Sequence, residues 1–234
     1  MNGTVELVDS VPEAFARLIA DRLGGIRHDP VSLALSGGTA KLSYEALAAL
    51  TGPDGERPLE WSSVDVYLSD ERCVPPDDAD SNHRMIEETL LRTVGPTFGD
   101  HPMYVSGAAE DAAAAYRRIV ADLEGLDVVH LGLGPDGHTA SLFAGSDALA
   151  VDDPELLVVA SRDPNARNPH DRITLTLPAL ARARLVVFTV AGRAKADAFG
   201  RLAAGEDLPA SRVTADEVVW LVDHEAAEGT VYAG

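Results

Sequence analysis

The chain has 234 residues, which is long enough to bury a sizeable core, and its 46% hydrophobic and 24% charged residues are typical of a soluble globular protein. Acidic residues outnumber basic ones by 38 to 19, and the formal net charge of −19 argues against nucleic acid and anionic membranes as partners, because both bind basic surfaces. The single cysteine, Cys73, excludes an intrachain disulfide, and with no evident signal peptide or membrane-spanning run we expect a cytoplasmic protein.

The first third of the chain alternates short apolar runs with segments of helical periodicity. The predicted strands of this part are Val5–Val8, Val31–Leu35 and Val64–Leu68. Hydrophobic residues after Pro12 recur at helical spacing and stop at Gly24 and Gly25, which predicts a first helix. A second helix is expected after Thr39. Its buried face is expected to consist of Leu42, Ala46, Leu47 and Leu50.

A turn of small polar residues and glycines, made of Ser36, Gly37, Gly38 and Thr39, stands between the second strand and the second helix. Unpaired N–H groups and the helix dipole would point at an anion placed there, and the hydroxyl groups would add donors. The turn therefore predicts a phosphate site. An equally good interpretation is a plain turn in which Thr39 caps the helix.

Charged residues follow the strand Val64–Leu68 directly, at its carboxyl end. Ligands of open α/β sheets bind beyond this end of the strands, so Asp70 and Arg72 fall in ligand position. The guanidinium of Arg72 has the planar fork that suits a phosphate or a carboxylate. The alternative is an ion pair on the surface within this short acidic and basic run.

The rest of the chain continues the alternation of strands and helices. Ser81 is expected to cap a helix that runs to Leu91, Ala108–Leu123 to form another, and Ala191–Lys195 to open a third. The strands expected here are Met103–Val105, Asp127–Leu133, Leu156–Ala160, Ile173–Leu177, Leu185–Val190 and Val218–Val222. The alternation predicts one α/β domain, residues 1–234, with a mostly parallel sheet and helices on both faces.

The stretch Asp127–Phe143 carries the strongest chemical signal. It begins as a buried strand, and glycines and Pro135 then break the strand before Asp136 and His138, which fall beyond its carboxyl end. The glycine spacing also matches the dinucleotide fingerprint, but it comes past mid-chain and lacks the acidic residue at the next strand end. An alternative interpretation is that Asp136 is only a turn-forming residue, without a chemical role. A helix is expected to begin near Thr139.

Four stretches together resemble one family, in the order in which that family carries them. They span about Leu33 to Ala196 and read LSGGTAKLSYEAL, LSDERCVPPDDADSNHRM, LGLGPDGHTASLF and RITLTLPAL followed by ARLVVFTVAGRAKA. By these motifs the chain resembles the 6-phosphogluconolactonases of the glucosamine-6-phosphate isomerase/6-phosphogluconolactonase family. The one departure is Ala144, where the family usually carries proline.

The resemblance implies a modified Rossmann-like fold, shared with glucosamine-6-phosphate deaminases and ribose-5-phosphate isomerases. It also implies hydrolysis of 6-phospho-D-glucono-1,5-lactone to 6-phosphogluconate in the oxidative pentose phosphate pathway, with no metal and no cofactor. His138 would be the general base, with Asp136 beside it, and Arg72 would line the substrate pocket. The chemistry leaves two candidates for stabilising the oxyanion, the backbone N–H groups of the glycine-rich loop and Arg72. The substrate-binding residues would be Asp70 and, at the phosphate, Gly37, Gly38, Thr39, Lys195 and Arg172.

Two other functions on the same fold stay open at this point. The deaminases use a glutamate where this chain has Phe143 and a tyrosine where it has Arg72, and both departures favour the lactonase. A non-catalytic, sugar-phosphate-binding regulatory protein would have no need of a base such as His138. We expect a small-molecule substrate, no nucleic-acid or membrane partner, and a monomer or small homo-oligomer.

Overall fold

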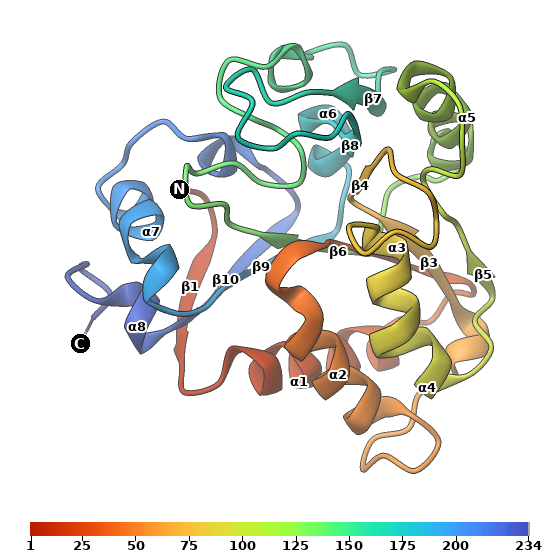
Figure 1. The fold of residues 1–234 in the computed structure, drawn as a ribbon. Coiled ribbons are helices and arrows are strands. Elements are labelled where there is room, and N and C mark those ends of the chain that lie inside the picture. The colour runs from red at the N-terminus through yellow and green to blue at the C-terminus, as the bar shows by residue number, and fades with distance from the viewer. Residues whose placement is uncertain (234) are drawn as a thin grey trace.

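Seven parallel strands form the central sheet of the computed structural model, which describes residues 1–233 (Figure 1). Their bounds are β1 Thr4–Val8, β2 Val31–Leu35, β3 Val64–Leu68, β5 Gly99–Asp100, β6 Val128–Gly132, β9 Leu185–Val190 and β10 Glu217–Asp223. They lie in the order β1-β10-β9-β6-β2-β3-β5, and each neighbouring pair runs parallel. The prediction of an α/β fold with a mostly parallel sheet is confirmed.

The strand order reverses between β2 and β6. From β2 the chain builds outward through β3 and β5, and it then returns to the other side of β2 with β6, β9 and β10. At such a reversal the connections that leave the two central strands diverge, which opens a crevice beyond their carboxyl ends. The turn after β2 and the glycine-rich loop after β6 both emerge into this crevice.

Helices flank the sheet. Their bounds are α1 Val11–Gly25, α2 Lys41–Thr51, α3 Asn82–Ile86, α4 Arg92–Val94, α5 Ala109–Ala121, α6 Leu177–Ala181, α7 Ala196–Ala203 and α8 His224–Ala227. Helices α1 and α2 lie side by side, and α8 packs beside the edge strand β1 (Figure 1). The first helix begins as expected, because the Ser10 side chain accepts a hydrogen bond from the Glu13 N–H and Pro12 lies in the first turn.

A second, antiparallel sheet of three strands was not predicted from the sequence. It consists of β4 Asp70–Arg72, β8 Arg172–Leu175 and β7 Val158–Ser161, in the order β4-β8-β7. The short run that follows β3 is therefore itself a strand, and it pairs Arg72 directly with Arg172. This sheet therefore brings Arg72 and Arg172, which are 100 residues apart in the sequence, next to each other beside the crevice.

The buried side chains of both sheets belong to one continuous hydrophobic core. Leu33 of β2 and Ile173 of β8, for example, are both fully buried within it. Among the described residues, no helix combines the length and the apolar composition that a membrane crossing requires.

The expected buried face of α2 is confirmed at Leu47 but wrong at Leu42. Leu42 is 63% exposed, whereas Tyr44 and Leu47 are fully buried together with Ala48. The helix begins at Lys41, after a 3-10 turn at Gly38–Ala40, and this start turns the Tyr44 side of the helix toward the sheet. Tyr44 offers a larger apolar area than Leu42 and can also hydrogen-bond through its hydroxyl group, as described below.

Two further expectations about secondary structure are wrong. The short strand expected at Met103–Val105 instead lies at Gly99–Asp100, where it pairs with β3. No helix starts near Thr139: the chain after His138 stays irregular, because its polar groups bond to the second sheet. The Ser141 N–H, for instance, donates to the Thr174 hydroxyl over 3.1 Å.

Candidate active site

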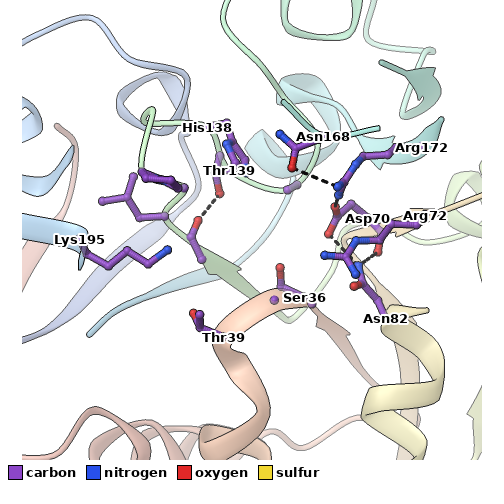
Figure 2. A pocket seen from close by; sticks show the side chains of 17 residues that line it. Ser36, Thr39, Asp70, Arg72, Asn82, His138, Thr139, Asn168, Arg172 and Lys195 are labelled. Atoms are coloured by element: carbon purple, nitrogen blue, oxygen red, sulfur yellow. Dashed lines mark hydrogen bonds and ion pairs between the residues drawn. The ribbon is translucent and has the colours of Figure 1, made fainter. Parts of the chain in front are cut away.

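A pocket lies in the crevice at the carboxyl ends of β2, β3 and β6, and Figure 2 shows the side chains that line it. Its lining residues are Ser36, Gly37, Gly38, Thr39, Asp70, Arg72, Asn82, Gly132, Leu133, Gly134, Pro135, His138, Thr139, Ala140, Asn168, Arg172 and Lys195. Every site residue predicted from the sequence lines this pocket except Asp136, which lies behind His138. The fold thus brings the four motifs together at one place.

The turn after β2 forms one wall of the pocket. Gly38 adopts φ +71°, a left-handed conformation that favours glycine. A side chain at Gly37 would collide with Asn82, since an added Cβ atom would lie 1.8 Å from the Asn82 Oδ1 atom. Thr39 does not cap the helix: the turn and α2 begin without a side-chain capping bond. The first backbone N–H groups of a helix have no hydrogen-bond partner within the helix, so those at the start of α2 can bind a ligand.

The loop after β6 forms the opposite wall and holds His138. An added Cβ atom at Gly134 would lie 2.2 Å from the imidazole ring, so only glycine lets the ring lie against this backbone. The Gly134 N–H donates to the His138 carbonyl over 2.8 Å, which closes the loop. Gly137 adopts φ +86°, and its Cα atom packs against Leu208.

His138 and Asp136 form a hydrogen-bonded pair in this loop. The Nδ1 atom of His138 bonds to the Asp136 carboxylate, and the His138 backbone N–H donates to the same oxygen over 3.2 Å. Burial raises the pKa of Asp136, but the charge of His138 and these hydrogen bonds lower it by more, so the carboxyl group stays ionised. An ionised partner at Nδ1 keeps the proton on that nitrogen and leaves Nε2 free to accept one.

Asp70 and Arg172 are both buried on the side of the pocket formed by the second sheet. The Ser141 hydroxyl donates to Asp70 Oδ2 over 2.6 Å, and Arg172 Nη1 lies 3.7 Å from the same oxygen. Arg172 also donates to Asn168 Oδ1 over 3.3 Å. Burial lowers the pKa of Arg172, while the charge of Asp70 opposes this effect and helps to keep a cation in the pocket.

Arg72 occupies the neighbouring position on β4. Its Nη1 atom donates to the Asp80 carbonyl over 2.6 Å, so the loop that follows β4 holds the guanidinium. The Nε atoms of Arg72 and Arg172 are both buried without a hydrogen-bond partner among the described residues. The alternative of an ion pair on the surface within the run Asp70–Arg72 is wrong, because Asp70 and Glu71 are buried, with exposed fractions of 4% and 1%.

Glu71 supports this wall of the pocket from behind. Its carboxylate accepts the backbone N–H groups of Arg72, Asn82 and His83 over 2.7 to 2.8 Å. Burial raises the pKa of Glu71, and the three N–H groups oppose that effect. The carboxylate therefore joins β4 to the start of α3, and the Asn82 side chain can reach Asp70, whose carbonyl accepts from Nδ2 over 2.9 Å.

Lys195 enters the pocket from the connection between β9 and α7. It lies on the same side as His138 and Thr39, opposite the two arginines (Figure 2). Burial lowers the pKa of its ammonium group, and the charge of Asp136 opposes this effect. The pocket thus has cationic groups at both ends and an imidazole between the walls.

Sequence reasoning missed three polar residues of the pocket as site residues: Asn82, Thr139 and Asn168. Thr139 lies inside a stretch in which the glycines, Asp136 and His138 carry the stronger chemical signal. Asn82 gave only the signal of a helix start, and Asn168 lies in an irregular segment without any periodic pattern. Among the described residues, no group of three or more His, Cys, Asp or Glu side chains is arranged to hold a metal ion.

Comparison with known proteins agrees with this geometry. The family model described as glucosamine-6-phosphate isomerases/6-phosphogluconolactonase matches residues 3–220. The chain belongs to this family. The 6-phosphogluconolactonase of Synechocystis is 38% identical over 84% of this chain and 83% of its own length, and that of Nostoc is 36% identical over 97% and 98%.

A solved structure extends the comparison to three dimensions. The 6-phosphogluconolactonase from Thermotoga maritima superposes with a TM-score of 0.80 at 30% identity, over 95% of this chain and 100% of that one. The resemblance drawn from the four motifs is therefore confirmed. So is the assignment of the chain to the enzymes of the 6-phosphogluconolactonase class, which are lactone hydrolases.

Proposed function

We propose that this pocket hydrolyses 6-phospho-D-glucono-1,5-lactone to 6-phosphogluconate, with His138 as the general base. The observation that carries the proposal is the His138–Asp136 pair, which leaves Nε2 free in a pocket that is also lined by the glycine turn after β2 and by Lys195. A base, a place for a phosphate and a cation beside it are what this substrate requires.

The reaction needs little activation, because a lactone is already a reactive ester. Nε2 of His138 removes a proton from water as the water oxygen attacks the C1 carbonyl carbon, and a tetrahedral oxyanion forms. The C1–ring oxygen bond then breaks, and the imidazolium returns the proton to the departing ring oxygen. The Asp136 carboxylate stabilises the imidazolium between these two steps, since it accepts a hydrogen bond from the Nδ1–H group.

The phosphate supplies binding energy at a distance from the reacting carbonyl. We assign it to the turn Gly37–Thr39 and to Lys195, with Arg172 as a further cation of the pocket. Arg72 is a candidate for the oxyanion, because it lines the pocket and the Asp80 carbonyl holds its guanidinium in place. Binding at both ends would hold the lactone carbonyl near His138.

Phe143 argues against the deaminase reaction. Its ring lies 4.9 Å from that of His138, and the Arg172 guanidinium lies 5.7 Å from the Phe143 centroid. A phenyl ring at this position packs the two polar groups but cannot transfer the protons that an amino-sugar ring opening requires. We further propose that the chain is one domain that acts in the cytoplasm on a small molecule, as a monomer or small homo-oligomer.

The direct test is turnover. The lactone is generated in situ, and the rate of its hydrolysis is measured with and without a chelator. The spontaneous rate of hydrolysis is subtracted. Fast loss that the chelator does not change is the expected result. Absence of acceleration, with glucosamine 6-phosphate deaminated instead, would refute the proposal in favour of the sister reaction, and turnover of neither compound would favour a sugar-phosphate-binding regulatory protein.

A further inference from the structure

A buried polar network lies directly beneath the turn after β2. Its centre is the hydroxyl group of Tyr44 on α2, which lies 2.8 Å from the Ser36 nitrogen, 2.7 Å from the Ser36 oxygen and 2.7 Å from His130 Nδ1. The other ring nitrogen of His130, Nε2, lies 2.8 Å from the Thr189 hydroxyl. Tyr44 and His130 are both completely buried.

Only one arrangement of protons satisfies every group of this network. The single Tyr44 proton must go to the Ser36 carbonyl, because a carbonyl oxygen can only accept, while the Ser36 N–H donates to the same hydroxyl. The remaining lone pair of Tyr44 then accepts from His130, so Nδ1 of that ring carries the proton. Nε2 is left as the acceptor for the Thr189 hydroxyl.

The surroundings keep His130 neutral. Burial lowers its pKa to about 3, and its ring packs against Phe15 with the centroids 4.4 Å apart. A neutral imidazole with a fixed tautomer is a rigid link, and it connects the Tyr44 hydroxyl to β9 across β6. Burial of these polar groups is favourable only when each is hydrogen-bonded, which this arrangement achieves.

The network ends at the residue that begins the anion-binding turn. Ser36 lines the pocket, and both of its backbone polar groups are bonded to the Tyr44 hydroxyl. The next residue of the turn, Gly37, is held by Asn82, whose side chain occupies the space where a Cβ atom of residue 37 would lie. The turn is thus held from below by Tyr44 and from the side by Asn82, while the N–H groups of Gly38 and Thr39 are left for a ligand.

We propose that Tyr44, oriented by His130, is a positioning residue that holds the Ser36–Thr39 turn in the geometry that binds the phosphate group of the substrate. This inference rests on the proposed function, which places the phosphate at that turn. Tyr44 itself does not line the pocket and acts only through Ser36.

The test compares two tyrosine-to-phenylalanine variants. Tyr44→Phe removes the hydrogen bonds that hold Ser36. Tyr116→Phe is the matched control, because Tyr116 is also buried and its hydroxyl accepts a 2.9 Å hydrogen bond from the Leu68 N–H, and neither residue lines the pocket. Tyr44→Phe is expected to raise the KM for the lactone and the Kd for 6-phosphogluconate by about tenfold, with kcat within about threefold. Tyr116→Phe should leave all three close to those of the wild type.

A thermal unfolding scan separates positioning from simple destabilisation. Tyr44→Phe removes the three hydrogen bonds of the Tyr44 hydroxyl and Tyr116→Phe removes one, so both variants should unfold at a lower temperature than the wild type, Tyr44→Phe at the lower of the two. If Tyr44→Phe is destabilised but binds 6-phosphogluconate as tightly as the wild type, Tyr44 is only structural and the proposal is overturned. Equal losses of affinity in the two variants would overturn it as well.

The tautomer of His130 gives a readout that does not depend on activity. In spectra of the protein labelled with 15N in histidine, Nδ1 of His130 should be protonated and Nε2 unprotonated from pH 5 to pH 8. A proton on Nε2 would mean that the Tyr44 hydroxyl points at His130 and not at Ser36, which would contradict the proposed role of Tyr44.

The outcomes also separate this proposal from the proposed function. Wild-type turnover with unchanged binding in Tyr44→Phe would remove the positioning role and leave the lactonase intact. No wild-type turnover, but 6-phosphogluconate binding that Tyr44→Phe weakens, would remove the lactonase and leave the positioning role. A wild type that does not bind 6-phosphogluconate would overturn both.

Discussion

Lys195 differs from the two arginines of the pocket in the way it is held. Arg72 and Arg172 each donate hydrogen bonds to neighbouring residues, which fixes the direction of their guanidinium groups. The Lys195 ammonium group has no hydrogen bond or ion pair with any other described residue, although burial lowers its pKa. An ammonium group of this kind is free to follow the phosphate of a bound substrate, so we expect it to contribute to binding more than to the chemical step.

Lys195→Ala should therefore raise the KM for the lactone by about tenfold or more and change kcat by much less. Steady-state kinetics at several lactone concentrations measures both constants. Arg193→Ala is the matched control, since Arg193 belongs to the same 3-10 turn but is exposed and pairs with Glu228 outside the pocket. An unchanged KM in Lys195→Ala would remove this residue from the phosphate site.

Single residues also show what the sequence could and could not predict about the site. His138 and Asp136 were recognisable because an acid and an imidazole follow a strand and a run of glycines. Asn168 was not, because only the fold brings its segment beside Arg172, to which it is hydrogen-bonded. Site residues that are placed by tertiary contacts, without a local motif of their own, leave no pattern to read.

At the scale of elements, the strands of the central sheet were the most predictable part of the fold. Val31–Leu35, Val64–Leu68 and Leu185–Val190 have the bounds that their apolar runs indicate, because buried parallel strands are predominantly apolar. The short strand β4 is polar and was therefore missed. It forms because β8 offers it a partner from a part of the chain about 100 residues away.

The turn that opens the pocket tolerates no side chain at its first glycine. Gly37→Ala should lower kcat/KM by about 10- to 100-fold, because the added Cβ atom would displace Asn82 and shift the turn by about an ångström. Gly200→Ala is the control: nothing lies within 4 Å of its Cβ position in α7, so it should stabilise the protein by up to about 1 kcal/mol at unchanged activity. Wild-type kcat/KM in Gly37→Ala would contradict the geometry described for this turn.

Helix α3 is joined to β5 by an ion pair whose strength depends on pH. The hydrogen bond to Asp100 raises the pKa of His83. Because the folded state holds the proton more tightly, the pair stabilises the protein fully below about pH 6.5, the ordinary pKa of histidine, and this stabilisation is lost as the pH rises through the raised pKa. The partly exposed pair should contribute only about 0.5 kcal/mol.

Asp100→Asn tests this by urea unfolding at pH 6 and at pH 9. The variant should be less stable than the wild type at pH 6, and the difference should shrink at pH 9. Asp9→Asn breaks the exposed pair with His224 and serves as the control, with a small difference at both pH values. If the loss of stability in Asp100→Asn grew with pH, the predicted direction of the pH dependence would be wrong.

At the scale of the whole molecule, the excess of acidic residues has to be reconciled with the anionic substrate that we propose. The formal net charge is −19, yet Arg72, Arg172 and Lys195 gather in the pocket. The fold resolves this by placing the cations in one crevice, where the surrounding protein weakens screening. The negative charges elsewhere repel one another and lower the stability of the compact state.

Added salt should therefore stabilise this protein. We expect the Tm at pH 7 to rise by about 2 to 6 °C when sodium chloride increases from about 20 mM to about 500 mM, because the Debye length then falls below 5 Å. The control is the same titration near pH 4.6, the isoelectric point of the sequence, where the increase should nearly vanish. A Tm that falls with salt at pH 7 would show that attractive ion pairs dominate instead.

The measurement that tests the central claim most directly is lactone turnover by His138→Ala beside the wild type. Loss of the general base should lower kcat by about 10² to 10⁴ and leave KM within a few-fold, because the phosphate site stays intact. His224→Ala, which changes an exposed histidine that does not line the pocket, should turn over at the wild-type rate. A folded His138→Ala variant with kcat within a few-fold of the wild type would contradict the assignment of His138 as the base.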